Sequence, residues 1–501
     1  MPKIMMVDVS GTSLTADEKS MFSEYKPAGI CLFGRNIQDR FQMAEFSQEL
    51  REHCGEDLVI AIDQEGGSVV RALDVPFSPG NMLLGAANDF ELTRQVAAAT
   101  ARGLKAMGIN MNFAPVADVN NNALNPVIGD RSFAEDPKKV AKHVIAYLQG
   151  LQSEGVAATV KHFPGHGDTS VDSHYDLPTL PHDMERLKAV ELYPFKKAIA
   201  AGVSTVMSYH GIVSAIDAEN PATLSYKVMT GLLRDELGFD GVSVTDALEM
   251  KAIAKTYSPA QAVIAALKAG IDMPLYDVHG ASIKTHIEIF EGVSKALESG
   301  ELDSFKIRQS QNRIRRLAKR YPIEANPDSA WQVGDRELLE LVATKAVVAI
   351  GDVPELDDIV LVYAKNIVGG LASGKMETPA QQLSVALRDS GIEAKEITYN
   401  RQDIDRALLN ELKSKNIVFV SASRTRMTQN EKRFAQELAK NSSKFLHIAL
   451  WNPYAVEDLP QPALISFGFR EWSIDAIVNS LKSTKSKGIM PISLKPWEVL
   501  I

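Results

Sequence analysis

The stretch GVAATVKHFPGHGDTSVDSHYDLP (155–178) joins a continuous apolar run to a segment of polar and turn-forming residues. Pro164, Gly165 and Gly167 constrain the backbone of that segment. Many α/β enzymes hold their reactive groups on loops that follow buried strands. The stretch therefore predicts a buried strand ending in a rigid, proton-active loop, and a plain polar surface loop is the alternative. Its lysine, histidine and aspartate side chains are Lys161, His162, His166, Asp168, Asp172, His174 and Asp176.

Seven further apolar runs share the length and character of this strand, and longer segments with helix signals separate them. Among these signals, Thr15 and Glu18 form a capping box, and a helix from Pro259 stops at Gly270. Continuous rather than alternating hydrophobicity indicates strands buried on both faces of a parallel sheet. Eight such units predict an α/β fold of the (β/α)8, TIM-barrel type, with an open doubly wound sheet as the alternative. The seven runs are KIMMVDV (3–9), GICLF (29–33), LVIAID (58–63), INMNFAP (109–115), STVMSY (204–209), GVSVTD (241–246) and GIDMPL (270–275).

Polar residues lie where these strands are expected to end. They are Asp63, Asp118, His162, His210 and Asp246. In a barrel, the carboxyl ends of all strands converge on one mouth, where catalysis takes place. In an open sheet the same residues would spread along an edge. The pattern favours the barrel.

The chain of 501 residues exceeds one ordinary core, so two domains are expected. The turn-rich segment YPIEANPDSAWQVGDRE (321–337) indicates a linker. We place a catalytic barrel at residues 1–322, a linker at 323–336 and a smaller α/β domain at 337–501. In that domain we expect Asp335 to cap a helix that runs over 338–350, followed by a mostly parallel sheet. Its predicted strands are DIVLVYA (358–364), NIVFVSA (416–422), FLHIALW (445–451) and LISFGF (464–469).

The bulk composition is that of a soluble globular protein, with 45% hydrophobic and 23% charged residues. The net charge of −9 argues against nucleic-acid or anionic-membrane partners. Cys31 and Cys54 are too few for a disulfide framework and are expected to be buried. The short apolar run at the N-terminus does not suit a signal peptide, and no stretch is long enough to span a membrane, so a cytoplasmic location is expected. A basic cluster is expected at a helix end: Arg313, Arg315, Arg316, Lys319 and Arg320.

Two groups of residues can support covalent and proton-transfer chemistry. Asp246, at the end of a predicted strand, can attack a carbon that becomes cationic, although it equally suits the N-cap of the next helix. Asp172, two positions before His174, can orient and charge that imidazole, which could then give and take back a proton. A histidine bonded only for loop stability is the alternative. Cleavage of a glycosidic bond needs one group at the anomeric carbon and another to protonate the leaving oxygen.

Residues 1 to about 320, which contain these groups, closely resemble the β-N-acetylglucosaminidases of glycoside hydrolase family 3. KHFPGHGDTSVDSH resembles the family's signature loop almost residue for residue. The order and approximate spacing of the motifs agree over the whole barrel. NPYAVEDLP and LISFGF are similar, less specifically, to the C-terminal domain of two-domain members. The other matching motifs are IDQEGGSVVR (62–71), NFAPVADV (112–119), GDRSF (129–133) and VTDALEM (244–250).

The resemblance implies roles for individual residues. Asp246 falls on the nucleophile, His174 on the acid/base and Asp172 on its partner. Five residues fall on positions that hold the terminal sugar: Asp63, Arg71, Arg131, Lys161 and His162. Four more lie near the same mouth with weaker claims: Asp118, Met207, Ser208 and His210. Hydroxyl-accepting carboxylates and donating cations suit that task.

Two departures from the family pattern lie close to the expected site. Members often have arginine where Ser68 stands, and some have an aromatic residue or a threonine-alanine pair where Ser208 and Tyr209 stand. These differences leave the sugar on the other side of the scissile bond undefined.

Other functions remain to be weighed. A zinc hydrolase could use His162, His166, His174 and Asp246, but Pro164 and Gly165 break the helix that would align the first two, and no HExxH motif is present. A sugar-binding protein without turnover would lack the nucleophile or the acid/base, and this sequence contains candidates for both. Phosphorolysis is open, because a neutral histidine does not repel phosphate as a carboxylate would.

The expected activity is that of a retaining exo-β-N-acetylglucosaminidase that forms a covalent glycosyl-enzyme intermediate and needs no cofactor or metal. A β-N-acetylglucosaminide phosphorylase or β-glucosidase of the same fold is the alternative. The expected partner is a saccharide containing β-linked N-acetylglucosamine, met in muropeptide recycling or in the breakdown of chitooligosaccharides. The oligomeric state and the role of the C-terminal domain are left open.

Overall fold

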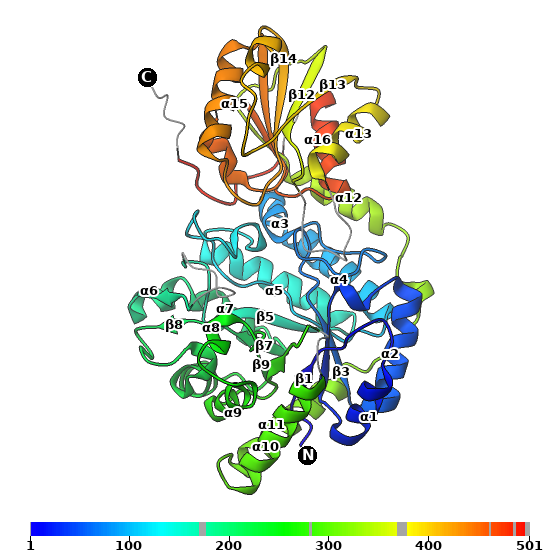
Figure 1. Cartoon of the computed structure of the whole chain (residues 1–501), viewed down its shortest axis with the longest axis vertical. Helices are drawn as coiled ribbons and strands as arrows, with labels where there is room; N and C mark the ends of the chain where they lie inside the picture. The colour runs from blue at the N-terminus through cyan, green and yellow to red at the C-terminus, as the bar shows by residue number, and fades with distance from the viewer. Residues whose placement is uncertain are drawn as a thin grey trace.

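The computed structural model describes residues 2–169, 177–279, 283–367, 378–459, 462–483 and 487–495. A larger N-terminal barrel lies below a smaller C-terminal domain, and helices α3 (Asn81–Ala87) and α12 (Asp335–Ala346) lie at their junction (Figure 1). None of the helices in the described part combines the length and apolar character needed to cross a bilayer.

The first sheet is a nearly closed parallel barrel, which confirms the predicted fold class. Its eight strands follow the order β10-β1-β2-β3-β4-β5-β7-β9. A parallel bridge between Val244 and Met273 joins β9 to the segment that leads into β10. The strands lie at or beside the predicted apolar runs: β1 (Met6–Val7), β2 (Gly29–Leu32), β3 (Val59–Ile62), β4 (Met111–Asn112), β5 (Ala157–Phe163), β7 (Thr205–Ser208), β9 (Val242–Thr245) and β10 (Leu275–Tyr276).

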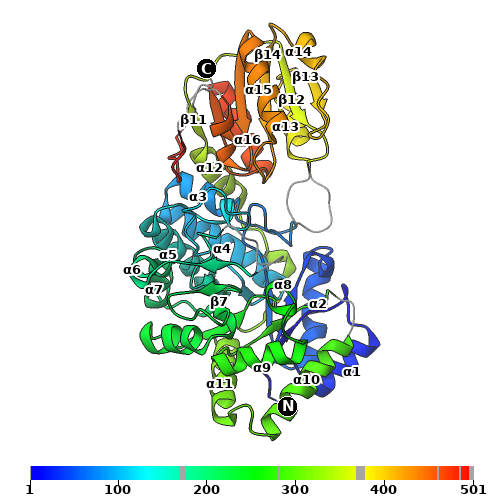
Figure 2. The same cartoon turned by 60° about the vertical axis from the view of Figure 1, so that its left-hand side comes forward.

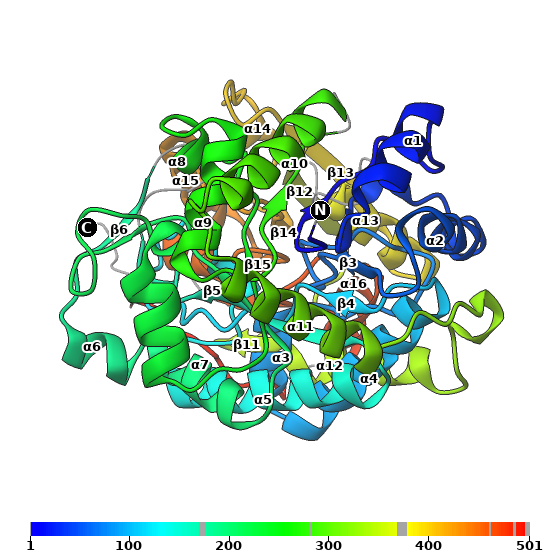
Figure 3. The ribbon, with the colours of Figure 1, turned by 90° about the horizontal axis from the view of Figure 1, so that it is seen from below.

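Helices cover the outside of this barrel. Seen from below, α1, α2, α4, α5 and α7 lie around strands β3, β4 and β5 (Figure 3). The capping box of Thr15 and Glu18 and the left-handed Gly270 stop are both present. The barrel helices are α1 (Ala16–Tyr25), α2 (Arg40–Cys54), α3, α4 (Phe90–Ala106), α5 (Pro137–Ser153), α6 (Met184–Ala189), α7 (Leu192–Ala200), the π-helical segment Lys227–Glu236, α8 (Lys251–Ala254), α9 (Pro259–Ala269), α10 (Ile283–Glu298) and α11 (Ser304–Arg320).

Smaller features of the barrel follow the sequence as well. The basic cluster lies on the C-terminal half of α11, where Arg313 and Arg316 pair with Asp240. Cys31 and Cys54 are buried free thiols. A short two-stranded sheet, β6 (Thr179–Leu180) with β8 (Ile212–Val213), lies outside the barrel sheet.

The second domain contains a six-stranded sheet in the order β11-β16-β15-β14-β12-β13, parallel except for β11. Its strands alternate with helices, and Figure 2 shows α13, α15 and α16 packed around them. The elements are α12, β11 (Val348–Ile350), β12 (Ile359–Ala364), α13 (Pro379–Asp389), β13 (Ala394–Tyr399), α14 (Leu408–Glu411), β14 (Asn416–Ser421), α15 (Gln429–Asn441), β15 (Lys444–Ala449), β16 (Ala463–Ile465) and α16 (Glu471–Ser483).

Two local expectations for this domain need correction, and one of its strands was not expected. The helix expected over 338–350 ends at Ala346, and β11 follows it, because a valine-rich run there pairs antiparallel with β16. Asp335 is the first helical residue rather than the cap, which is Gly334. Strand β13 was not expected, since its charged residues Lys395 and Glu396 interrupt the apolar pattern on this exposed edge.

The main hydrophobic core is continuous between the two domains. The same cluster of buried side chains includes Ile60 in the barrel and Leu361, Val418 and Leu446 in the second sheet. Val362 and Phe419 alternate along their strands with Leu361 and Val418, and they belong to a separate cluster on the other face of that sheet. Ion pairs such as Arg102–Asp335 reinforce the junction.

Candidate functional site

The mouth of the barrel collects charged residues from several strands. Asp63 follows β3, Lys161 and His162 lie near the end of β5, and Asp246 follows β9. Arg131 reaches the same region from the long segment between β4 and α5. The structure thus brings together residues that stand up to 183 positions apart in the sequence.

A β-bulge positions two consecutive side chains of β5. The pairing of β5 with β7 shifts by one residue between Val160 and Phe163, so the extra residue falls at Lys161–His162. Successive side chains in a regular strand point to opposite faces, and a bulge re-aims them. As a result, both Lys161 and His162 reach the same group of polar residues.

Lys161 lies between two carboxylates. Its Nζ is 2.6 Å from Asp63 Oδ1 and 2.5 Å from Glu65 Oε1. Glu65 also receives two parallel hydrogen bonds of 2.8 Å from Arg131 Nε and Nη2. Two cations and two carboxylates therefore form one buried, charge-balanced network.

The network fixes the charge of its members. Burial alone would raise the pKa of Glu65, but Arg131 and Lys161 outweigh burial and hold that pKa well below its usual range. Burial alone would lower the pKa of Lys161, and the attraction of Asp63 and Glu65 raises it instead. Both groups are ionised at neutral pH.

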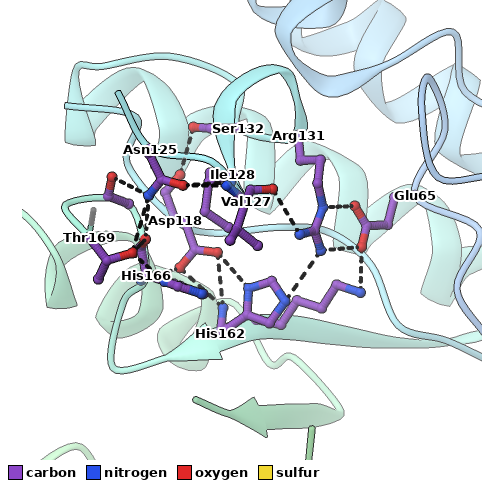
Figure 4. A network of polar contacts seen from close by, with 12 residues as sticks. Glu65, Asp118, Asn125, Val127, Ile128, Arg131, Ser132, His162, His166 and Thr169 are labelled. Atoms are coloured by element: carbon purple, nitrogen blue, oxygen red, sulfur yellow. Dashed lines mark hydrogen bonds and ion pairs between the residues drawn. The ribbon is translucent and has the colours of Figure 1, made fainter. Parts of the chain in front are cut away.

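Asp118 organises the turn that follows β5. Its carboxylate accepts hydrogen bonds from the backbone nitrogens of His162 and His166, and from His162 Nδ1 at 2.7 Å. On the other side of the ring, Arg131 Nη2 lies 3.3 Å from His162 Nε2, as Figure 4 shows. Because a carboxylate only accepts, His162 Nδ1 carries the proton of its hydrogen bond to Asp118.

His166 is buried behind this ring. Its Nδ1 lies 2.8 Å from Thr169 Oγ1, and its ring packs against Tyr209 with centroids 4.5 Å apart. Burial, with the neighbouring His162, lowers the pKa of His166 to about 3. His166 therefore stays neutral and supports the fold of the loop.

Asp246 is held as a carboxylate. Burial acts to raise its pKa, but His210, His162 and the backbone N–H of Ala247 outweigh burial and lower the pKa to about 2. The hydrogen bond from Ala247 N to Asp246 Oδ1 is 2.9 Å. The N-cap alternative is wrong, because the next helix, α8, begins at Lys251 with Met250 as its cap.

Three other expected site residues lie on or just after β7. Met207 and Ser208 are buried, and Ser208 Oγ lies 2.8 Å from Thr223 Oγ1. His210 Nδ1 is also 2.8 Å from Thr223 Oγ1, and its Nε2 donates to the carbonyl of Ala247 at 3.0 Å. His210 therefore holds the backbone next to Asp246.

Arg71 lies in the loop that also contains Glu65. Its backbone N–H donates to Gln64 Oε1 at 2.8 Å, and its guanidinium lies 6.0 Å from the centre of the Phe33 ring. Asp172 and His174, the expected acid/base pair, lie outside the described residues. Just before them, Asp168 Oδ2 is 2.8 Å from His182 Nε2.

Glu65 was missed by sequence reasoning, although it is the anion that both cations share. The available signal was a carboxylate two positions after Asp63 in IDQEGG. The glycines after it make a tight turn: Gly66 has a φ of +97°, and a Cβ there would lie 2.4 Å from the carbonyl oxygen of Ser78. Glu65 immediately precedes this turn, and its carboxylate meets Lys161 and Arg131 there.

A second carboxylate cluster lies at the ends of β1 and β10. Arg35 Nη2 bridges Asp8 and Asp277 at 2.6 and 3.1 Å. Burial and the charge of Asp277 raise the pKa of Glu249 to about 8, and burial with Asp8 raises the pKa of Asp277 to about 6. At neutral pH, Glu249 is mostly protonated.

Two groups of described residues have ligand atoms close enough to hold a metal ion: Asp168, His182 and Glu191, and Glu249, Asp277 and His279. In the first, Arg186 already pairs with Glu191 at 3.2 Å. Neither group includes His162, His166 or Asp246, the described members of the proposed zinc set.

The model of the glycosyl hydrolase family 3 N-terminal domain matches residues 2–317. The chain belongs to glycosyl hydrolase family 3. This confirms the resemblance seen in the sequence motifs and the expected class, a glycoside hydrolase.

Individual family members are similar over different lengths. The chain is 37% identical to beta-hexosaminidase A of Pseudoalteromonas piscicida over 337 residues, 62% of this chain and 56% of that protein. It is also 37% identical to the beta-hexosaminidase of Stenotrophomonas maltophilia over 54% of this chain and 82% of that protein. A solved family 3 beta-N-acetylglucosaminidase from Paenibacillus sp. FPU-7 is 33% identical, with a TM-score of 0.89, over 100% of this chain and 98% of that one.

Proposed function

We propose that this protein is a retaining exo-β-N-acetylglucosaminidase that removes terminal β-linked N-acetylglucosamine. The observation that carries the proposal is Asp246, a carboxylate kept ionised at the barrel mouth beside His162 and Lys161. The names of the similar proteins, beta-hexosaminidases and a beta-N-acetylglucosaminidase, support the choice of sugar.

In the proposed reaction, Asp246 attacks the anomeric carbon while His174, as imidazolium, protonates the departing oxygen. A glycosyl-enzyme ester forms and the aglycone leaves. Neutral His174 then takes a proton from water, which attacks the same carbon and releases the β-configured sugar and the Asp246 carboxylate. Asp172 orients and charges the imidazole.

The terminal sugar is proposed to bind to the charged network around Lys161. Asp63 can accept hydrogen bonds from hydroxyl groups, and Lys161 and Arg131 can donate to hydroxyl or acetamide oxygens. Arg71, in the loop that contains Glu65, adds a further cation. Met207 and Ser208 lie near the mouth. His162 is positioned by Asp118.

We further propose that the natural substrates are muropeptide-derived or chitooligosaccharide-type molecules and that the protein works in the cytoplasm without nucleic-acid or membrane partners. The net charge of −9 supports the absence of such partners. Turnover of N-acetylglucosaminyl-anhydro-muramic acid compared with turnover of chitobiose separates the two substrate classes.

A single experiment tests the activity and its alternatives. Purified protein is incubated with an aryl β-N-acetylglucosaminide, with and without inorganic phosphate, and the products are followed by proton NMR. We expect the β-anomer of free N-acetylglucosamine to appear first, at a rate that phosphate does not change. A sugar 1-phosphate would establish phosphorolysis, the α-anomer would contradict retention, and binding without cleavage would indicate a sugar-binding protein. Faster cleavage of an aryl β-glucoside than of its N-acetylglucosaminide would indicate a β-glucosidase.

A further inference from the structure

The second domain makes polar contacts with barrel loops that carry site residues. Arg470 Nε donates to the carbonyl of Gly67 at 3.0 Å, in the loop that holds Glu65 and Arg71. Asn120 Nδ2 donates to Tyr454 Oη at 2.9 Å, two residues after Asp118. These contacts place the second domain directly behind the loops of the barrel mouth.

A third contact reaches Arg131 itself. Arg424 Nη2, from the second domain, donates to the carbonyl of Val127 at 2.6 Å, and Arg131 Nη1 donates to the same carbonyl at 3.2 Å. A carbonyl oxygen has two lone pairs and can accept from both. The Val127 carbonyl is therefore a shared support for one guanidinium from each domain.

The loop around Val127 is held on its other side by Asn125. Asn125 Oδ1 accepts from the backbone nitrogens of Val127 and Ile128, each at 2.8 Å. Its Nδ2 donates to the carbonyls of His166 and Gly167 at 2.8 and 2.9 Å (Figure 4). Within the barrel, this side chain links the loop to the turn after β5, whereas Arg424 fixes the loop from outside the barrel.

Arg424 is itself anchored in the second domain. Asn452 Nδ2 donates to its carbonyl at 2.8 Å, and Arg426, two residues later, pairs with Glu457 and Asp458 at 2.7 Å each. Arg424 is an exposed residue outside the hydrophobic clusters, so its removal opens no cavity in the core.

We propose that Arg424 is a positioning residue for substrate binding: it fixes the Val127 carbonyl and thereby the guanidinium of Arg131 in the sugar site. The second domain thus takes part in recognition of the terminal sugar without touching it. This inference rests on the proposed function, because it assumes that Arg131 contacts the sugar.

Kinetics of a double-mutant cycle test the proposal. We expect Arg424→Ala to raise KM for an aryl β-N-acetylglucosaminide about tenfold with a smaller change in kcat, and Arg424→Lys to restore part of the loss. In an Arg131→Ala background, Arg424→Ala should change KM no further, because its effect passes through Arg131. Arg406→Ala, which removes an exposed ion pair with Glu437 in the same domain, is the control.

An unchanged KM in folded Arg424→Ala, or effects that add in the cycle, would overturn the proposal. Hydrogen–deuterium exchange gives a readout that does not need turnover. Amides of residues 125–131 should exchange faster in Arg424→Ala than in wild type, and at the wild-type rate in Arg406→Ala. If the wild type neither binds nor cleaves N-acetylglucosaminides, the proposed function fails. Equal exchange in wild type, Arg424→Ala and Arg406→Ala would contradict the positioning role of Arg424.

Discussion

Asp246 shows how surrounding charges set the state of one residue. Burial favours its neutral form, yet His210, His162 and the N–H of Ala247 keep it ionised, with a pKa of about 2. Glu249, three residues later, has the opposite outcome because its charged neighbours are carboxylates. Two acids in one short segment thus take opposite protonation states at neutral pH.

Asp246→Asn is expected to lower kcat at least a thousandfold, because the amide cannot form the glycosyl ester. The fall should appear in steady-state hydrolysis of an aryl β-N-acetylglucosaminide, while the melting temperature changes little. Asp240→Asn, at an exposed aspartate just before β9, is the matched control. Retained turnover in Asp246→Asn would assign the nucleophile elsewhere.

Glu249 predicts a pH dependence of stability. Its folded pKa, about 8, lies above its ordinary value of 4.5, so the folded state holds the proton more tightly. The unfolding free energy should therefore fall as pH rises from about 5 to 8 and level off above that.

Glu249→Gln should remove this part of the pH dependence. The variant should match wild type near pH 5 and exceed it at pH 8.5 by on the order of 1–3 kcal/mol, measured by urea unfolding. Glu298→Gln, at an exposed glutamate on α10, should follow wild type throughout. Parallel curves for wild type and Glu249→Gln would contradict the raised pKa.

At the scale of elements, the strands and helices mostly lie where local patterns place them. The eight barrel strands coincide with or adjoin the apolar runs, because a strand buried on both faces needs continuous hydrophobicity. The bulge in β5 has no such local signature, because it depends on how β5 pairs with β7. Strand β13 escaped prediction for a related reason: its edge position tolerates charge.

Close packing of α4 against α5 gives a prediction for this scale. A Cβ on Gly150 would lie 2.2 Å from the carbonyl oxygen of Arg94 and 2.8 Å from Ala97 Cβ. Gly150→Ala should therefore destabilise the protein by about 1–3 kcal/mol, seen as a lower melting temperature.

Gly231→Ala is the control for this packing. Its nearest neighbour outside the helix would be the Tyr226 carbonyl at 3.9 Å, so the change should be neutral or slightly stabilising. Equal melting temperatures for Gly150→Ala and wild type would show that α4 and α5 can separate without cost.

At the scale of the whole molecule, the two domains share one hydrophobic core. The cluster that contains Ile60 of the barrel also contains Leu361 and Leu446 of the second sheet. Ion pairs across the junction include Arg102–Asp335 and Lys345–Asp89. Unfolding of one domain alone would expose this shared apolar surface to water, which costs free energy.

We therefore expect a single transition in differential scanning calorimetry, with the calorimetric and van't Hoff enthalpies close to each other. Weakening the junction with Arg102→Ala should lower the transition temperature without splitting it. Two separate transitions in the wild type would show that the domains unfold independently.

The sequence by itself determined the fold class, the family and the positions of most polar groups at the barrel mouth. Periodicity, caps and strand-end residues are local properties, so neighbouring residues specify them. Only the tertiary structure decided that Glu65 joins Lys161 to Arg131, that His162 Nδ1 donates to Asp118, and that Arg424 meets the Val127 carbonyl. Such contacts join residues from 44 to 297 positions apart, and their distances depend on how the whole chain packs.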